Sequence, residues 1–356
     1  MRESLLSLGL DSQASSLVEN AHRSSTQEAY QSHWNAWLCW CELKGVSPYS
    51  PTSRDSANYL ASLSLDRGLS ASSVRVHRAA ISTTIKQRGG PSFSEDPLLG
   101  FISKGIANRQ VTSKPIMPAW DLFLVLSSLR EAPYEPLSST SLKFLTQKTV
   151  FLVSLASGRR CSEVHAFCGK NIGREPDGSL SLSFLPGFLA KNQPAGMQAP
   201  PVVIKGLTHR VCSDDPDRTL CPVRALSRYR RRTNASRSSL QRRLFLPYKD
   251  NKNDDVSKAT VSRWIRDVIA RAYNSSSDAA DPKSFRAHEV RAWASSLAFS
   301  HNTSLEDVMK AAFWRNNGTF MEYYLRDVSR LNEDGSRGIS SVVAAQQTLS
   351  VATQRL

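Results

Sequence analysis

Side chains that can hold an oxyanion and move a proton lie close together late in the sequence. His288 and Arg291 are three residues apart, a spacing that places two side chains on one face of a helix. Trp314 and the adjacent pair Tyr323 and Tyr324 follow soon after. A guanidinium binds oxyanions, an imidazole handles protons and a phenol can accept a transferred group, so this stretch offers the parts of a group-transfer site.

Two stretches earlier in the sequence add further cationic groups. In the first, an apolar helix is expected to end at Gly158, and the next helix to begin with Arg160 in its first turn. In the second, Lys191 lies between two strand-like runs, residues 179–185 and 201–205. Each pattern alone is common. The simplest interpretation of His-x-x-Arg is a surface helix turn, and that of Lys191 is an ordinary lysine in a turn. Their order along the chain is far more specific.

In that order, the elements resemble the active site of the tyrosine recombinase (phage integrase) family. That site combines an Arg after a Gly, a hairpin Lys, a His-x-x-Arg helix, a His or Trp, and a nucleophilic Tyr. The resemblance covers most of the chain, from about residue 24 to residue 328. Trp314 and the sequence Tyr-Leu-Arg-Asp at residues 324–327 are most similar to recombinases of DIRS-like, Ngaro and Crypton mobile elements.

The resemblance implies a fold that is mainly α with a small β-sheet: a helical N-terminal core-binding (SAM-like) domain and a mixed α/β catalytic domain. It also implies two arginines, Arg160 and Arg291, that neutralise the pentacoordinate phosphate, since a guanidinium donates two hydrogen bonds while it stays charged. The family's spacing after the glycine selects Arg160 over Arg159, which would contact backbone phosphate or solvent. Glu163 would orient an Arg or His.

The remaining roles follow from the same resemblance. Lys191 would protonate the leaving 5′ oxygen, with Lys205 as the fallback, and nearby cations and burial would have to lower its pKa from about 10.4. His288 would bind the phosphate or take the proton of the tyrosine. Trp314 would donate its indole N–H to a phosphate oxygen, because indole donates but does not accept.

The nucleophile is one of two adjacent tyrosines. The general recombinase spacing favours Tyr323, whereas the mobile-element pattern Phe-x-x-x-Tyr-Leu-Arg-Asp favours Tyr324, which we expect to react. Its attack would leave a 3′-phosphotyrosyl bond and a free 5′ hydroxyl, and would retain the bond energy for rejoining. The resemblance implies no metal, nucleotide or other cofactor.

The net charge of +15 and the pI near 9.8 indicate a polyanionic partner, here double-stranded DNA. Residues 1–113 hold 11 Lys and Arg against 9 Asp and Glu, and the rest of the chain holds 35 against 22. Basic runs are often only solvated faces or localisation signals. We expect phosphate contacts from nine residues: Arg75, Arg78, Lys86, Arg159, Arg228, Arg230, Arg231, Arg232 and Arg263. For the first three, a solvated face is an equally good interpretation.

With 356 residues, 40% of them apolar, the chain is long enough for two domains. We expect a flexible N-terminus (1–23), a helical DNA-binding domain (24–110), a linker (111–118), a catalytic domain (119–332) and a C-terminal tail (333–356). Helical patterns in the first domain cover about 25–43, 53–65, 70–88 and 96–108. The first begins with a capping-box pattern at Ser25, and its apolar stripe, which includes Trp34, Trp37 and Cys41, should face the core. In the third, Arg75, His77, Arg78 and Lys86 can face outward.

Helical patterns in the second domain cover about 119–130, 141–157, 256–273 and 286–294, with another starting at 221. In the helix at 256–273, Val261, Trp264 and Val268 should face inward. The tail either packs on a neighbouring protomer, as in the family, or is disordered.

The spacing of the cysteines and the length of the apolar runs indicate in which cellular compartment the protein is located. Six Cys lack the paired spacing of zinc sites or secreted disulfides, which favours a reducing environment. No apolar run reaches membrane-spanning length, and the first residues do not read as a signal peptide. The expected location is the nucleus in a eukaryote or the cytoplasm in a prokaryote, without secretion.

The sequence therefore predicts a site-specific recombinase or integrase that cuts and rejoins DNA as a tetramer on two recombining sites. The expected biological context is integration or excision of a transposable element or retrotransposon. A type IB topoisomerase would share the chemistry but act as a monomer on any plasmid. A DNA-binding protein descended from a recombinase would bind DNA without forming a covalent protein–DNA adduct. A plain helical interaction protein would not bind DNA.

Overall fold

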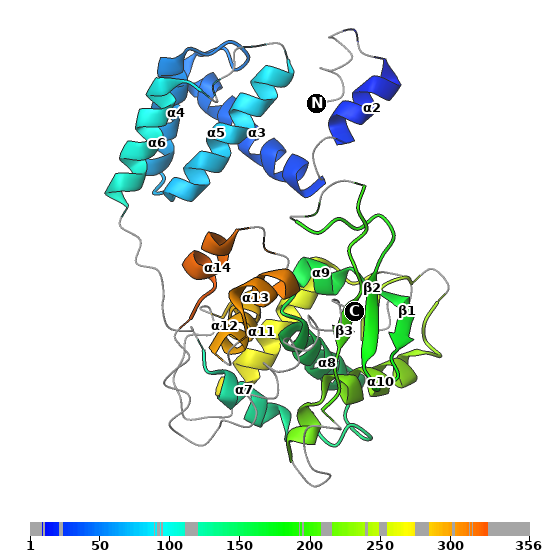
Figure 1. Ribbon diagram of the computed structural model, residues 1–356. Helices are drawn as coiled ribbons and strands as arrows, with labels where there is room; N and C mark the ends of the chain where they lie inside the picture. The colour runs from blue at the N-terminus through cyan, green and yellow to red at the C-terminus, as the bar shows by residue number, and fades with distance from the viewer. Residues whose placement is uncertain are drawn as a thin grey trace. The chain divides into compact units, whose positions relative to one another are not determined.

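The structure, a computed structural model, describes residues 9, 11–20, 24–88, 90, 93, 95–110, 120–191, 193, 196–207, 216–238, 241–248, 255–274, 285–300, 303–312, 314 and 316–326. The chain divides into two compact units, Met1–Ser113 and Lys114–Leu356. This division falls in the predicted linker, which lies outside the described residues together with the predicted tail. The prediction of a mainly α chain with a small sheet is confirmed (Figure 1).

The first unit is built of helices only, within the described residues. Four of them match the predicted ranges to within one residue at each end, whereas α2 lies in the stretch expected to be flexible. The five helices are α2 (Ser12–Asn20), α3 (Ser24–Lys44), α4 (Ser53–Leu65), α5 (Ala71–Gln87) and α6 (Pro97–Arg109).

Side-chain caps start three of these helices. Thr52 and Asp55 form a capping box at the start of α4, and the side chains of Ser70 and Asp96 accept backbone N–H groups at the starts of α5 and α6. A capping box was expected at Ser25, but α3 already begins at Ser24, and the side chain of Ser25 lies outside the described part.

The core of this unit is rich in aromatic rings. Trp34, Trp37 and Cys41 are buried, as the apolar stripe of the sequence predicted. His77 was expected to face outward, and this was wrong: it is 5% exposed, and its Nδ1 lies 2.9 Å from the hydroxyl of Tyr59. The reason is that α5 packs against α3, α4 and α6, so its buried face is wider than that of a helix covered on one side.

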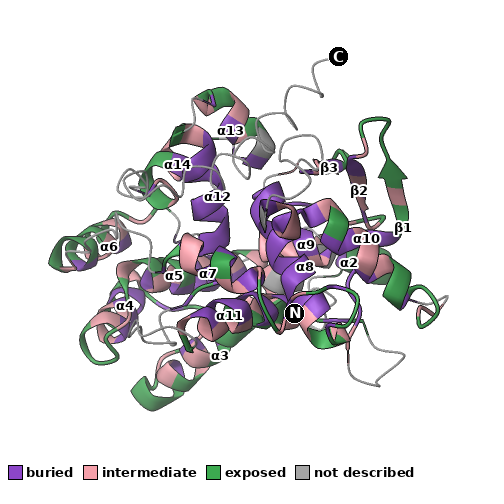
Figure 2. Cartoon of the chain, turned by 90° about the horizontal axis from the view of Figure 1, so that it is seen from below, coloured by how far each residue is buried: buried purple, intermediate pink, exposed green. Residues whose placement is uncertain are grey.

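The second unit surrounds one long helix. Every residue of α8 from Leu145 to Ser157 is buried, and α8 packs against α10, α11 and α12 (Figure 2). Its helices are α7 (Leu122–Leu129), α8 (Leu142–Ser157), α9 (Cys161–His165), the short η1 (Pro216–Leu220), α10 (Pro222–Thr233), α11 (Lys258–Asn274), α12 (Glu289–Ser300), α13 (Leu305–Ala312) and α14 (Asn317–Tyr323). The predicted inward stripe of α11, which includes Val261, Trp264 and Val268, is confirmed.

A three-stranded antiparallel sheet lies beside these helices in the order β1–β2–β3. The strands β2 (Leu180–Phe184) and β3 (Val202–Ile204) coincide with the two predicted runs. The sequence did not indicate β1 (Phe167–Arg174), because two glycines, a lysine and an asparagine give this stretch a low strand propensity. Its Gly169 is needed: a Cβ there would stand 2.4 Å from the guanidinium of Arg237.

A small apolar cluster joins the last three helices. It contains Ala298 of α12, Val308 and Ala312 of α13, Trp314 between α13 and α14, and Phe320 of α14. Because this cluster ties α13 and α14 to α12, it determines where the aromatic residues near the end of the described chain lie. Among the described residues, no helix combines the length and the apolar character that crossing a membrane requires.

Candidate active site

Arg291 is the buried centre of the candidate site. It is 2% exposed, and its Nη1 donates to the carbonyl oxygen of Gly158 at 2.9 Å while Nη2 donates to that of Ala312 at 2.5 Å. These carbonyls lie at the C-terminal ends of α8 and α13, where a helix lacks its own donors and carries partial negative charge. One guanidinium therefore joins three helices at their ends.

Two aromatic rings lie against this guanidinium. The Cζ of Arg291 is 4.2 Å from the ring centroid of Trp314 and 5.4 Å from that of Tyr324, and the two rings are 4.8 Å apart. Trp314 is 6% exposed, and its indole N–H meets no acceptor within the described part of the chain. The stack thus holds a phenol beside a fixed cation and a buried indole N–H.

The charges around Arg291 act on one another. Burial lowers the pKa of Arg291 to about 9, the positive charge of Arg160 acts in the same direction, and Glu163 and Tyr324 oppose this shift. Arg291 therefore stays charged at neutral pH. A cation that has already lost its water is suited to stabilising charge that develops on a phosphate, because no reorganisation is needed during the reaction.

Arg160 reaches the site from the junction of α8 and α9. Gly158 ends α8 in the left-handed conformation with a φ of 58°, and α9 begins directly after Arg160. The Nη1 of Arg160 lies 3.0 Å from Oε1 of Glu163, and Oε2 accepts the backbone N–H of Arg160 at 3.2 Å. The carboxylate is fully buried, while 17% of the Arg160 side chain stays accessible. Glu163 thus orients a guanidinium that can still meet a ligand.

Arg159 was expected to meet solvent or backbone phosphate, but the structure buries it. It is 6% exposed, and burial lowers its pKa to about 10. The cause is the turn at Gly158, which directs the first residue after α8 inward and the second, Arg160, toward the site. A direct DNA contact of Arg159 stays a prediction, and its burial speaks against a position on the surface.

The two tyrosines occupy different environments. Tyr323 is 61% exposed, whereas Tyr324 is partly buried and packs against the cluster that contains Trp314. Within the described contacts, only the ring of Tyr324 meets both Trp314 and Arg291. The geometry therefore favours Tyr324 as the reactive phenol.

His288 does not share a helical face with Arg291 as expected. The helix predicted to start at residue 286 begins at Glu289, so His288 lies in the preceding turn, where it is exposed. Partial burial of its ring lowers the pKa of His288, while the charges that act on it belong to Glu289, Arg286 and Arg326. Its role in the reaction stays a prediction.

The two candidate lysines lie near the sheet. Lys191 is an exposed turn residue between β2 and β3, and the contacts described above for Arg291 do not include it. Lys205 follows β3 and lies 3.7 Å from a carboxylate oxygen of Asp177. Since Lys205 has an acidic partner in this unit, Lys191 remains the better candidate for the general acid.

The residues expected to contact DNA fall into two groups. Those with exposed side chains are Arg75, Lys86, Arg231, Arg232 and Arg263, and Arg230 is half-buried. A second group, which includes the exposed Arg232, donates hydrogen bonds within its own unit. Arg228 donates to the carbonyls of Leu137 and Ser138 at 3.2 and 3.1 Å, and Arg232 donates to that of Thr140.

Arg78 also acts within the protein. It donates to the carbonyls of Leu99 and Phe93 at 3.1 and 3.3 Å, and to the hydroxyl of Ser103 at 3.2 Å. The expectation that Arg78 faces out was wrong, because its long side chain extends over α6 and satisfies carbonyls there. Contacts of these arginines with DNA stay predictions.

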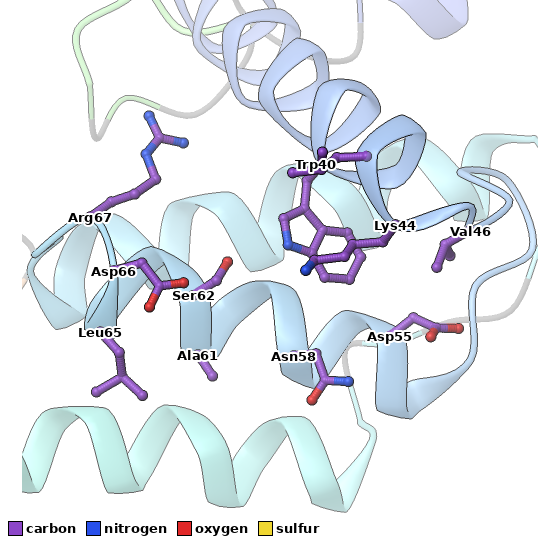
Figure 3. Close-up of a pocket in the computed structure, with 11 residues that line it drawn as sticks. Trp40, Lys44, Val46, Asp55, Asn58, Ala61, Ser62, Leu65, Asp66 and Arg67 are labelled. Carbon is purple, nitrogen blue, oxygen red and sulfur yellow. The ribbon is translucent and has the colours of Figure 1, made fainter.

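A cavity of about 680 Å³ lies in the first unit, whereas the residues predicted to react belong to the second. It is lined by α3 and α4, and Figure 3 shows Trp40 and Lys44 on one side of it and Asp55 and Asn58 on the other. Its lining includes both acidic and basic residues, and none of the predicted site residues. It is therefore separate from the candidate site.

Sequence reasoning missed Arg326 and Ser296, whose contacts hold the main chain beside Tyr324. A signal for Arg326 existed, since it belongs to the same Tyr-Leu-Arg-Asp stretch as Tyr324 and is only 9% exposed. No signal marked Ser296, because a serine on an apolar helix usually bonds to its own helix.

No protein-family model matches the sequence. A search of curated proteins likewise finds no match. Among solved structures, XerA recombinase is similar, with 14% identity, coverage of 93% of this chain and 95% of that chain, and a TM-score of 0.39. A lambda integrase dimer bound to a COC′ core site has 14% identity, coverage of 86% and 73%, and a TM-score of 0.49.

A second lambda integrase dimer on a COC′ core site has 16% identity, coverage of 88% of this chain and 95% of that chain, and a TM-score of 0.46.

Proposed function

We propose that this chain cuts and rejoins double-stranded DNA through a covalent tyrosyl intermediate, in the manner of a tyrosine recombinase. The observation that carries the proposal is the stack of Tyr324 and Trp314 on the buried guanidinium of Arg291. Arg160, oriented by Glu163, supplies a second cation whose charge acts on Arg291. A phenol beside one fixed guanidinium, with a second guanidinium whose charge acts on the first, has the parts needed to attack a phosphodiester.

In the proposed step, the phenol oxygen of Tyr324 attacks the phosphorus and forms a new P–O bond. The bond from phosphorus to the 5′ oxygen breaks, and the oxygen leaves with the electron pair and takes up a proton from Lys191. The phenol proton passes to His288. Arg160, Arg291 and the indole N–H of Trp314 hold the other phosphate oxygens while charge develops on them. These roles are hypotheses that follow from the resemblance and the stack together.

The products are a 3′-phosphotyrosyl bond and a free 5′ hydroxyl. Attack by a 5′ hydroxyl on that bond releases the tyrosine and reseals the strand, and the number of phosphoester bonds stays constant. The reaction therefore needs no energy source. In the proposed setting, four protomers act on two DNA sites during integration or excision of a mobile element, in the nucleus of a eukaryote or the cytoplasm of a prokaryote. Support for this setting is Trp314 and the Tyr-Leu-Arg-Asp stretch.

The covalent step gives the test. The purified chain is incubated with nicked duplexes taken from its flanking genomic or element termini, and protein-linked DNA is sought on a denaturing gel. Tyr324→Phe and Arg291→Ala should abolish the adduct, while Tyr323→Phe should retain it. Loss of the adduct with Tyr323→Phe alone would move the nucleophile by one residue.

Other outcomes would point to other functions. Tight binding to those termini without an adduct from the unchanged protein would favour a DNA-binding protein that no longer cuts. Relaxation of a plasmid that carries no specific site would favour a topoisomerase. Absence of DNA binding at moderate salt would contradict all three.

A further inference from the structure

A serine fastens the main chain around Tyr324 to α12. The Oγ of Ser296 donates to the carbonyl oxygen of Tyr324 at 3.1 Å and accepts the backbone N–H of Arg326 at 2.9 Å. Ser296 is 1% exposed. A single buried hydroxyl thus bonds to the main chain on both sides of Leu325, and these two bonds set the position from which the ring of Tyr324 extends.

An ion pair of the Arg326 side chain fastens the same segment to α12. The Nη2 of Arg326 lies 3.5 Å from Oε1 of Glu289, and their side chains are 8% and 7% exposed. The Nη1 of Arg326 donates to the carbonyls of Tyr323 and Leu325 at 3.1 and 3.3 Å. The guanidinium therefore folds back on the segment that follows α14 and also connects it to the first residue of α12.

Both fastening points lie on the helix that carries the phosphate-binding candidate. Glu289 and Ser296 are seven residues apart, which is close to two helical turns, so they share one face of α12. Arg291 lies between them in the sequence, and its guanidinium meets the ring of Tyr324. One helix thus holds the cation directly and the phenol through its main chain.

The segment has a reason to need fastening. The helix α14 has seven residues, and a helix of this length is not stable by itself. Of its own residues only Phe320 is buried. Without the contacts to α12, the ring contacts described for this segment would be those of Tyr324 and Phe320 with Trp314.

We propose that Glu289, Ser296 and Arg326 are positioning residues that hold Tyr324 at Arg291 of its own chain. The inference rests on the proposed function, since it assigns the three residues to the alignment of the attacking phenol. The proposal gives none of them a contact with the reacting phosphate. They act through the carbonyl and amide groups on both sides of Leu325.

The test separates alignment from folding and from DNA binding. Single-turnover adduct formation on a nicked duplex is measured for Ser296→Ala, Glu289→Gln, Arg326→Met and the double variant of the last two, with DNA affinity measured in parallel. Ser296→Ala should slow the adduct about tenfold, which corresponds to the loss of about one net hydrogen bond. Each ion-pair variant should slow it at least as much, and Arg326→Lys should recover part of the rate.

The double variant should be no slower than the slower single variant, because both changes break the same link. DNA affinity should stay unchanged throughout. Arg130→Met is the matched control: it removes the pairing of Arg130 with Asp217 in the same unit, and it should lower thermal stability without slowing the adduct.

Hydrogen exchange gives a readout that does not depend on cutting. The amides of Leu325 and Arg326 should exchange about tenfold faster in Ser296→Ala than in the unchanged protein. If the unchanged protein forms no adduct, the proposed function fails, and the exchange rates still test the fastening. If it forms one and the variants react at its rate, or if Arg130→Met slows the reaction equally, the positioning role is refuted while the proposed function stands.

Discussion

The indole of Trp314 allows stability and reactivity to be separated by one pair of substitutions. Its ring packs against the guanidinium of Arg291 at 4.2 Å and against the rings of Tyr324 and Phe320 at 4.8 and 5.3 Å. Trp314→Ala removes all of these contacts. It should cost about 3 to 5 kcal/mol of unfolding free energy, the usual range for a buried Trp replaced by Ala. A desolvated cation–π contact alone accounts for about 2 kcal/mol of this.

Trp314→Phe keeps an aromatic ring and removes the N–H. Since that N–H has no acceptor in the described part of the chain, no hydrogen bond within the protein is lost. The expected cost is about 1 to 2 kcal/mol, for the smaller ring only. If the N–H binds a phosphate oxygen in the transition state, adduct formation should slow by about 100-fold, the range measured for single oxyanion donors.

A matched control lies in the same unit. Trp264 is 1% exposed, and its indole N–H also lacks an acceptor in the described part of the chain, but it packs on Tyr248 rather than on Arg291. Urea unfolding of the full chain and single-turnover cutting are measured for both Phe variants. Trp264→Phe should lose similar stability and keep the full rate. Equal rates for the two variants would refute the role of the Trp314 N–H, and equal stability of Trp314→Phe and Trp314→Ala would refute the importance of the ring stack.

Three further predictions concern protonation and the assembly of the site. Burial lowers the pKa of His77 from 6.5 to about 4, so the unfolded chain binds more protons than the folded chain between these pH values, and the free energy of unfolding should fall by about 3 kcal/mol as the pH drops through this range. Urea unfolding at pH 7.5 and 4.5 should show this loss in the unchanged protein but not in His77→Gln. Burial lowers the pKa of Lys148 from 10.5 to about 8, so the unfolded chain binds more protons than the folded chain between these pH values, and the free energy of unfolding should rise by about 3 kcal/mol as the pH increases from 8 to 10.5. Urea unfolding across this pH range should show no such rise for Lys148→Met. Because the ring of Tyr324 lies against Arg291 of the same chain, mixing Tyr324→Phe with Arg291→Ala should restore no adduct, and a restored adduct would show that the tyrosine is supplied by another protomer.

The elements of the fold that could be predicted are those with strong local signals. In the first unit, caps at Thr52, Ser70 and Asp96 and regular apolar spacing gave helix ends to within one residue. The strand β1 could not be predicted, because its pairing with β2 overrides a weak local preference. Burial of His77 likewise depends on three helices that pack around α5, and no periodicity within α5 encodes that.

The candidate site shows the same limit at the level of single residues. The family's spacing after Gly158 indicated Arg160 rather than Arg159, and the structure buries Arg159 while 17% of the Arg160 side chain stays accessible. The sequence did not decide between Tyr323 and Tyr324 as the nucleophile, because only the packing around two adjacent residues can distinguish their environments. The carbonyl partners of Arg291 could not be foreseen either, because they lie 133 and 21 residues away in the chain.

The arginines that bind main-chain carbonyls change what the net charge means for DNA. Arg78, Arg228 and Arg237 each donate to two carbonyls of their own unit, and Arg243 pairs with Asp255. A cation held in this way displaces fewer counterions from a duplex than a free one. Each phosphate left without a protein partner lowers the dependence of log K on log salt by about 0.9. Binding to DNA should therefore weaken with added salt less steeply than a charge of +15 suggests, and the exposed arginines of α10 and α11 should set that slope.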